Sequence, residues 1–389
     1  MSEETEMLTA GQTGHSAWPI GQQVSTVYRW DDTRLVSDAP ALVRLPTGRL
    51  LCSVQLWSRD DTAARLYGRG CCLVFASEDD GLSWREQARL PFLTGKFLSH
   101  DGTLYFLGAG LGRQGLWITR SGDAGRNWSK PVCLLKGGVY AASTGWVQKA
   151  GHLYWAADNN HPSVRGRKVF VMAANLVQDL LDPGTWRFSI AIAHPGVPQV
   201  FGRGEHNGGK WLEPNVVSFG GQLRLVVRVR VSQDQVDGVV PNVAAVCDLA
   251  DDGETLSLGF SHYYPVPGAQ NHFHIVYDAQ SRLNWMTSNL VTGIAEDLWR
   301  GWGKERRFLM LHYSVDGLNW FSAGCLATAP GVRQAFNYCT PLIDGEDLLV
   351  VSRTALEAAN QHDNDRITFH RVAAFRRLAM NLFPHRQSG

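Results

Sequence analysis

Tyrosine, glutamate, histidine and arginine gather in a few segments of this chain, where together they could bind and cleave an acidic substrate. Glu213 and Arg228 are separated by one expected hairpin, and tyrosines stand at Tyr140 and Tyr338. Tyrosine, histidine and carboxylate side chains can move protons or act as nucleophiles. Several arginines together indicate a carboxylate-bearing ligand, because the guanidinium fork matches a carboxylate in geometry and charge.

The other polar candidates fall in similar connections between expected strands. They are His161, Arg165 and Arg167 in the loop 159–167, His206, the run Asn271, His272 and His274, the pair Arg306 and Arg307, and Asn337, Arg353 and His362 near the C-terminus. None of these residues identifies a site by itself. Their convergence on one mouth of a common fold would make the set informative.

A turn motif that occurs three times indicates what that fold is. The segments read SEDDGLSW at 77–84, SGDAGRNW at 121–128 and SVDGLNW at 314–320, and DPGTW at 182–186 is a degenerate fourth copy. In such a turn aspartate can bond the local backbone and glycine permits a positive φ. We expect the tryptophan to fold back and pack between sheets.

Strand-turn-strand segments repeat around these turns and divide the chain into six four-stranded units. The last unit offers only three strands, and the segment STVYRW near residue 25 can supply the fourth. Radial repetition of this kind leaves few exposed strand edges. The sequence therefore predicts an all-β, six-bladed β-propeller as a single domain at residues 21–380. We expect a disordered N-terminal tail at 1–20 and a C-terminal tail at 381–389, and a seventh blade in the longer connections remains the alternative.

Strand direction alternates within each blade, so the connections fall on two faces. The turns joining the first strand to the second, and the third to the fourth, share one face with the repeated turn motif. This assigns Asp79, Asp123, Asp316 and the nearby His100 to a structural face. The other connections, which carry the polar candidates, share the opposite face.

The amino-acid composition limits the kinds of partner and cofactor that we expect. The chain has 389 residues, 44% of them hydrophobic, and a net charge of +1, so no overall charge favours nucleic acid or a membrane surface. Seven cysteines without CxxC spacing argue against a zinc site and a full disulfide framework. We expect no metal and no cofactor. The polar N-terminus shows no signal peptide, which favours a cytoplasmic protein unless a leader has been removed.

The turn motif resembles the Asp box of sialidase-type propellers, and the resemblance covers almost the whole chain. WLEPNVVSFGGQLRLVVR resembles the family's Glu-to-Arg hairpin, which implies that Glu213 partners the catalytic tyrosine and Arg228 is the second of three arginines. KERRFLMLHYS resembles the segment of the third arginine, at Arg306 or Arg307. NYCTPLIDG resembles the segment of the nucleophile, at Tyr338.

The first arginine of that family is missing. The alignment places Asp38 at its position, and Arg353 where the family has the glutamate that braces it. We therefore hypothesise that Asp38 and Arg353 form a charge-swapped ion pair across the closure of the ring. Such an exchange would rebuild the carboxylate site.

The closing run VSRTALEAANQHDNDRITFHRV resembles propellers that include lyases of ulvan and of rhamnose–glucuronate chains. That resemblance implies β-elimination from a uronic acid. Arg228, with Arg165 or Arg167, would neutralise the carboxylate, His161 or His206 would be the base, and Tyr140 or Tyr338 the acid.

The favoured function is therefore an enzyme that cleaves an acidic oligo- or polysaccharide by β-elimination. One alternative is a sialidase-type glycoside hydrolase with Tyr338 as nucleophile and Glu213 as its partner. A second is a sugar-binding propeller without catalysis. The expected substrate-binding residues are Arg165, Arg167, Arg228, Arg307, Arg353, Asn337 and His362.

Overall fold

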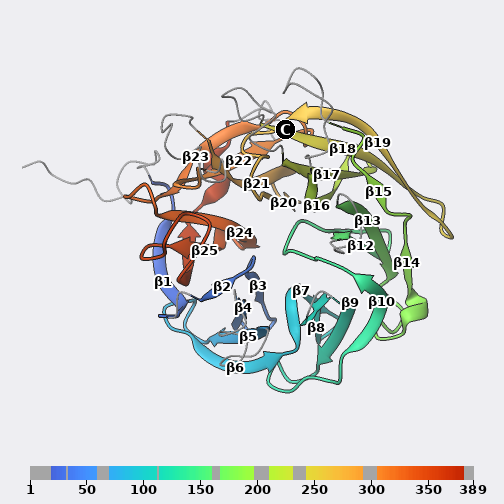
Figure 1. The fold of residues 1–389 in the computed structure, drawn as a ribbon, viewed down its shortest axis with the longest axis horizontal. Helices are drawn as coiled ribbons and strands as arrows, with labels where there is room; N and C mark the ends of the chain where they lie inside the picture. The colour runs from blue at the N-terminus through green and yellow to red at the C-terminus, as the bar shows by residue number, and fades with distance from the viewer. Residues whose placement is uncertain are drawn as a thin grey trace, which may run out of the picture.

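Six antiparallel sheets surround a common axis in the computed structural model of this chain (Figure 1). The structure describes residues 19–31, 34–58, 70–111, 114–159, 167–196, 210–230, 242–291 and 305–380. The prediction of an all-β, six-bladed propeller is confirmed. In each blade we call the strands A to D, from the innermost strand to the outermost.

The first three blades follow the order of the chain. In blade 1, β2 (Leu35–Ser37) and β3 (Ala41–Arg44) both pair with β4 (Leu50–Ser58), followed by β5 (Gly70–Ser77) and β6 (Arg85–Leu90). Blade 2 contains β7 (Phe92–His100), β8 (Thr103–Gly110), β9 (Gln114–Ser121) and β10 (Val132–Gly138). Blade 3 contains β11 (Val147–Lys149), β12 (His152–Asn159), β13 (Lys168–Asn175), the 3₁₀ turn η2 (Pro183–Thr185), β14 (Trp186–Phe188) and β15 (Ile192–Ala193).

The remaining blades complete the ring. Blade 4 contains β16 (Lys210–Phe219), β17 (Gln222–Arg230), β18 (Val243–Asp251) and β19 (Leu256–Pro265). Blade 5 contains β20 (His274–Asp278), β21 (Leu283–Leu290), β22 (Phe308–Ser314) and β23 (Phe321–Thr328). Blade 6 contains β24 (Ala335–Asp344), β25 (Asp347–Ala355) and β26 (Arg366–Val372), and η5 (Phe375–Leu378) follows it.

The N-terminal strand β1 (Gln22–Arg29) closes the ring by pairing with β26, from Gln22 opposite Arg371 to Arg29 opposite Arg366. Figure 1 shows this first strand, in blue, beside the last blade, in red. The predicted closure by the segment near residue 25 is therefore confirmed. Blade 6 owes its outermost strand to the beginning of the chain.

The core is a ring of apolar layers rather than one central cluster. Each of the six junctions between neighbouring blades is filled by its own group of buried side chains. Leu107 of blade 2 and Trp155 of blade 3 are fully buried in one of them, and Leu50 of blade 1 and Phe369 of blade 6 in another. Hydrophobic burial of this kind fixes each blade against the next.

The repeated turns join strands C and D, and their side chains pack against the neighbouring blade. In the first, Asp79 Oδ1 accepts hydrogen bonds from the Ser77 hydroxyl (2.8 Å) and the Ser83 amide (2.9 Å). Gly81 has φ 87°, and a Cβ there would lie 2.2 Å from the Phe369 ring. The Trp84 ring packs edge-on against Phe369 at 5.5 Å between centroids. As expected, the tryptophan packs between sheets.

Candidate active site

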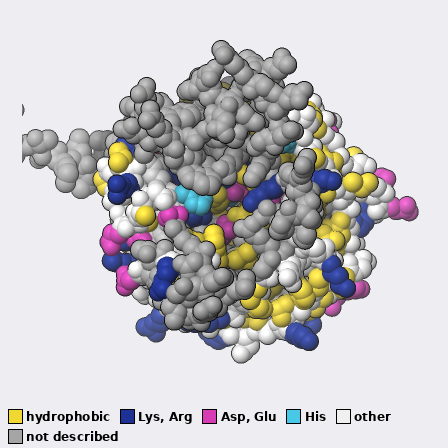
Figure 2. Space-filling view, in the orientation of Figure 1, with side chains coloured by type: hydrophobic (Ala, Val, Ile, Leu, Met, Phe, Trp, Pro, Cys, Tyr) yellow, Lys and Arg dark blue, Asp and Glu magenta, His cyan; other side chains and the backbone are white. Residues whose placement is uncertain are grey.

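On the face of the ring opposite the repeated turns, the ends of the strands bring the polar candidates together around the axis. Strand A begins, strand B ends and strand C begins on this face of every blade. Figure 2 shows basic, acidic and histidine side chains gathered in the hollow at the centre of this face. Polar side chains of the described residues therefore gather at the mouth of the ring that lies opposite the repeated turns.

Bulges in two inner strands present Glu213 and Tyr338. The pairing register shifts at corresponding places in β16 and β24, and the two residues stand within the shifts. Their φ values are 50° and 49°. A left-handed backbone is unfavourable for residues with a side chain and persists where surrounding contacts determine it. The inner strand of blade 1 is also interrupted, between β2 and β3, and Asp38 lies in that break.

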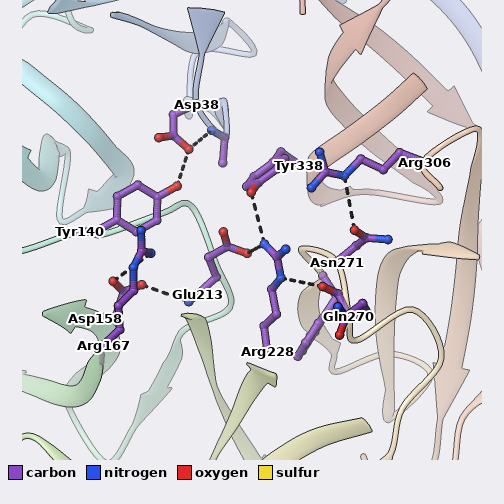
Figure 3. Close-up of polar contacts among 12 residues, drawn as sticks. Asp38, Tyr140, Asp158, Arg167, Glu213, Arg228, Gln270, Asn271, Arg306 and Tyr338 are labelled. Carbon is purple, nitrogen blue, oxygen red and sulfur yellow. Dashed lines mark hydrogen bonds and ion pairs between the residues drawn. The ribbon is translucent and has the colours of Figure 1, made fainter. Parts of the chain in front are cut away.

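Arg228, near the end of β17, joins these two residues (Figure 3). Its Nη1 donates to Glu213 Oε2 at 2.7 Å and to the Tyr338 hydroxyl oxygen at 3.2 Å, and its Nε donates to the Gln270 carbonyl at 2.9 Å. Arg228 is 2% exposed and Glu213 3%. Burial raises the pKa of the Glu213 carboxyl, but the charges of Arg228 and His272 and the hydrogen bond from Arg228 outweigh it and lower that pKa to about 2.

Two further arginines lie against the Tyr338 ring. The guanidinium carbons of Arg306 and Arg353 are 5.4 Å and 4.9 Å from its centroid, and the His272 ring stacks on it at 4.8 Å. Among the described residues, Nη1 and Nη2 of Arg306 have no hydrogen-bond partner although both are buried. Burial, together with the nearby charges of Arg228 and Arg353, lowers the pKa of Arg306 to about 10. The surroundings of Tyr338 are therefore rich in cations and offer unused donors.

Tyr140 and Asp38 form the other side of the site. The Tyr140 hydroxyl donates to Asp38 Oδ1 at 2.5 Å, and both side chains are buried. Burial, reinforced by the negative charges of Asp38 and Glu213, raises the pKa of Tyr140 well above its usual value. Tyr140 and Tyr338 belong to one small buried cluster, completed by Ala39 and Ala142. The pair therefore keeps a proton close to Tyr338.

Asp158 connects the two sides. Its Oδ1 is 3.2 Å from Nη1 of Arg167, and its Oδ2 accepts the backbone N–H of Glu213 at 3.2 Å. Arg167 also lies over the Tyr140 ring at 5.1 Å. A fully buried aspartate thus fixes an arginine and the bulge that carries Glu213.

The structure separates the predicted site residues into three groups. Tyr140, Glu213, Arg228, Tyr338 and Arg353 converge as described above. Asn337, which is 1% exposed, donates from Nδ2 to the Gln361 carbonyl beside them. His161, Arg165 and His206 lie outside the described residues.

Three other predicted ligands are held by partners close to them in the chain. Arg167 pairs with Asp158, and Arg307 pairs with Glu305 Oε1 at 2.5 Å. Of the neighbours Arg306 and Arg307, it is therefore Arg306 that contacts Tyr338. His362 contributes its backbone carbonyl, which accepts from Nη2 of Arg353. Its side chain is 44% exposed and lies 3.5 Å from Asp363.

The hypothesis of an ion pair between Asp38 and Arg353 is wrong. In the part of the chain that the structure describes, Asp38 accepts from Tyr140 and from the Ala39 amide, and Arg353 bonds the His362 carbonyl. No ion pair joins the two. Tyr140, from blade 3, instead donates to Asp38, the residue that the alignment placed at the position of the family's first arginine.

Sequence reasoning gave Asp158 no role, although a signal was present. Asp158 ends the apolar strand YWAAD, and the strand-direction argument places every B-strand end on the site face. His272 was a polar candidate without an assigned role, and its stacking on Tyr338 could not be read from the sequence. Burial lowers the pKa of His272 to about 4, so its imidazole is neutral at pH 7.

Neither a metal centre nor a membrane span was found within the described ranges. No group of three or more histidine, cysteine, aspartate or glutamate side chains there is placed to hold an ion. The helical segments described are too short to cross a bilayer.

Comparison with known proteins identifies the fold. No protein-family model and no curated protein matches the sequence. A solved structure of a protein of unknown function from Dyadobacter fermentans is 13% identical, with a TM-score of 0.60, covering 91% of this chain and 100% of that one. An α-L-arabinanase from Penicillium chrysogenum, complexed with arabinobiose, is 13% identical, with a TM-score of 0.56, covering 91% and 98%.

A sialidase from Trypanosoma rangeli, in complex with sialic acid, is 16% identical with a TM-score of 0.56. The match covers 92% of this chain but 59% of that longer protein. At these identities the comparisons show a shared propeller fold, on which many different chemistries occur.

Proposed function

We propose that this chain is a glycoside hydrolase that acts on a carboxylate-bearing sugar, with Tyr338 as nucleophile. The observation that supports the proposal is the bridge made by Arg228, whose Nη1 binds both the Glu213 carboxylate and the Tyr338 oxygen in a buried site. A tyrosine nucleophile with a glutamate partner is the arrangement of sialidase-type glycosidases. The fold shared with an arabinanase and a sialidase agrees with a saccharide substrate.

The arginine cluster supports an acidic rather than a neutral sugar. Arg228, Arg306 and Arg353 surround Tyr338, and the terminal nitrogens of Arg306 have no partner among the described residues. A carboxylate that accepts from these nitrogens would satisfy buried donors that are costly to leave unpaired. The scissile bond of the same sugar would then lie near the Tyr338 oxygen.

The proposed reaction begins when the substrate carboxylate draws the Arg228 guanidinium away from Glu213. The freed Glu213 carboxylate accepts the Tyr338 proton, and the phenolic oxygen attacks the anomeric carbon. The glycosidic C–O bond breaks, and the leaving oxygen takes a proton from the Tyr140 side of the site. Water then attacks the anomeric carbon, its hydroxyl joins the sugar and its proton restores the Tyr140 side. The C–O bond to Tyr338 breaks, and the phenolic oxygen takes its proton back from Glu213.

Elimination from a uronic acid is the second candidate. The sequence assigned its base to His161 or His206, which lie outside the described residues, so that mechanism rests on fewer placed groups. The observation that favours it is the buried, neutral His272 stacked on Tyr338. A neutral imidazole beside an arginine-bound carboxylate could remove a C5 proton.

A panel of sialosides, uronate-containing saccharides and neutral arabinosides separates these functions. We expect reducing sugar to be released from a carboxylate-bearing substrate without the ultraviolet absorbance of an unsaturated uronate. Tyr338→Phe should lower kcat by several orders of magnitude, because the nucleophile is lost. Tyr264→Phe, at a half-buried tyrosine that donates to Asn319 away from the site, is the matched control and should leave kcat unchanged.

Other outcomes overturn the proposal in distinct ways. New ultraviolet absorbance that survives Tyr338→Phe would establish the lyase. Saccharide binding without turnover of any substrate in the panel would indicate a binding protein.

A further inference from the structure

A second cavity lies on the ring axis at the opposite mouth from Tyr338, beneath the turns that join strands A and B. Its volume is about 840 Å³, within the size range of small-molecule sites. The inner strands of all six blades contribute to its wall, through segments such as Lys96–Ser99 of β7 and Trp146–Lys149 around β11. None of the residues described above in the candidate active site lines it.

The charged side chains that line this cavity are all basic. The described residues that line it include Lys96, Lys149 and Arg282 and no aspartate or glutamate. Two acids near the A–B turns pair with other cations, Asp278 with Arg376 and Asp344 with Arg44. The charged side chains that the described part of this wall presents are therefore all basic.

Lys96 is the most unusual of these cations. It is 8% exposed, and no carboxylate among the described residues forms an ion pair with it. Its Nζ donates to the Thr144 carbonyl at 2.6 Å, lies 3.3 Å from Nε2 of His274, and is 4.4 Å from the Trp146 ring centroid. A buried ammonium without a counter-ion is unfavourable, and a bound anion would remove the penalty.

The remaining wall suits a small organic anion rather than a bare ion. The half-buried Trp146 and the 55% exposed Tyr277 present aromatic rings, and Gln148 and Asn284 add amide groups. Aromatic rings combine a large apolar surface with a polar edge, which matches the faces of a sugar ring. Lys149 Nζ already donates to the Gly221 carbonyl, which holds that lysine at the rim.

We propose that this cavity is a second binding site, which takes a sugar-sized carboxylate with the carboxylate group at Lys96. The site is independent of the active site proposed above. It lies at the other mouth of the ring and uses different residues of the same inner strands.

Calorimetric titration with glucuronate tests the proposal. The protein used carries Tyr338→Phe and Arg306→Met, so that the candidate active site around Tyr338 is impaired and binding there contributes little. We expect glucuronate to bind, and Lys96→Met on that background to weaken it by about 10- to 100-fold, as for loss of a charge-assisted hydrogen bond. Lys130→Met, at an exposed lysine outside the cavity, is the matched control and should have no effect.

Two comparison ligands identify what is recognised. Glucose should bind at least about tenfold more weakly than glucuronate, because it lacks the charge. Binding of inorganic phosphate with the same dependence on Lys96, without binding of glucuronate, would overturn the sugar-acid assignment. Glucuronate binding that is unchanged by Lys96→Met, or no binding at all, would overturn the site.

If Lys96→Met does not fold, a variant with substitutions at the edge of the cavity tests the same proposal. Lys149→Ala with Arg282→Ala removes two cations from the exposed edge of the cavity and leaves its floor intact. We expect this pair to weaken glucuronate binding about tenfold or more. Unchanged binding in the rim variant would likewise overturn the proposal.

Discussion

Glu213 and Tyr338 occupy corresponding bulges in the inner strands of blades 4 and 6, and one guanidinium nitrogen, Nη1 of Arg228, bonds both. Bulges commonly re-aim a side chain next to an active site. Here two of them turn side chains from separate blades towards the same buried arginine. The left-handed backbone at both positions is thus linked to one electrostatic centre.

Replacing Glu213 should destabilise the fold as well as abolish activity. Glu213→Gln leaves Arg228 buried without its counter-charge, which typically costs about 3–5 kcal/mol. Urea unfolding at pH 7 measures the loss. Adding Arg228→Met should recover part of it, because the unpaired charge is then removed, and additive losses in the double variant would contradict this account.

The same ion pair predicts an acid-sensitive stability. The pKa of Glu213 is lowered from 4.5 to about 2 in the folded protein, so its contribution is complete above pH 4.5 and lost as the pH falls towards 2. Over that interval the stability of the wild type should fall more steeply than that of Glu213→Gln. Parallel unfolding curves for the two proteins would show that Glu213 does not carry the effect.

Tyr140 should matter most when the leaving group is poor. Tyr140→Phe removes the proton shared with Asp38, so hydrolysis of unactivated saccharides should slow far more than hydrolysis of nitrophenyl glycosides, which need little acid assistance. The ratio of the two kcat/KM losses is the measurement. Equal losses on both substrates would assign Tyr140 to positioning alone.

Lys96 gives the protein a second interval, at neutral to alkaline pH, in which stability rises with pH. Burial lowers its pKa from 10.5 to about 7, so between those values the unfolded chain holds a proton that the folded chain has released. Stability therefore gains a rising contribution from pH 7 to about pH 10. His274 faces the same amine, and burial keeps the pKa of that histidine well below this range. Comparison with Lys96→Met isolates the effect, which should vanish in that variant.

The serine–aspartate turn between β5 and β6 should affect stability without affecting catalysis. Asp79→Ala removes the acceptor for Ser77 and Ser83 on the face opposite the active site. We expect a lower denaturation midpoint and unchanged kcat/KM. Asp101→Ala, in the adjacent A–B turn of blade 2, is a control on the same face. A selective fall in kcat/KM for Asp79→Ala would link this turn to the active site.

The blades could be predicted because their signals are local. Gly81 and Trp84 belong to one short turn, and that turn fixes the order and direction of its flanking strands. The same strand-direction argument placed Tyr140, Glu213, Arg228 and Tyr338 at one mouth. These inferences needed no knowledge of how blades meet.

The partners within the site could not be predicted, because they depend on contacts across the axis. Asp38 and Tyr140 are separated by 102 positions, and nothing local to either indicates their hydrogen bond. Arg306 and Arg307 are adjacent, so the exact register of the chain decides which reaches Tyr338. Lys96 stands alone in the apolar strand FLTGKFLSH, a signal that was visible but belonged to no motif.

The pairing of β1 with β26 sets the order of events during synthesis. A ribosome releases the partner of Gln22 only after it has translated Arg371, so β1 must wait until the other five blades and the inner strands of blade 6 have been made. Until then the edge of the sixth blade and the first strand are both without a partner, and unpaired edges are prone to wrong association. The ring consequently closes only after β26 has been translated, and a chain terminated before β26 would lack this closing pair of strands.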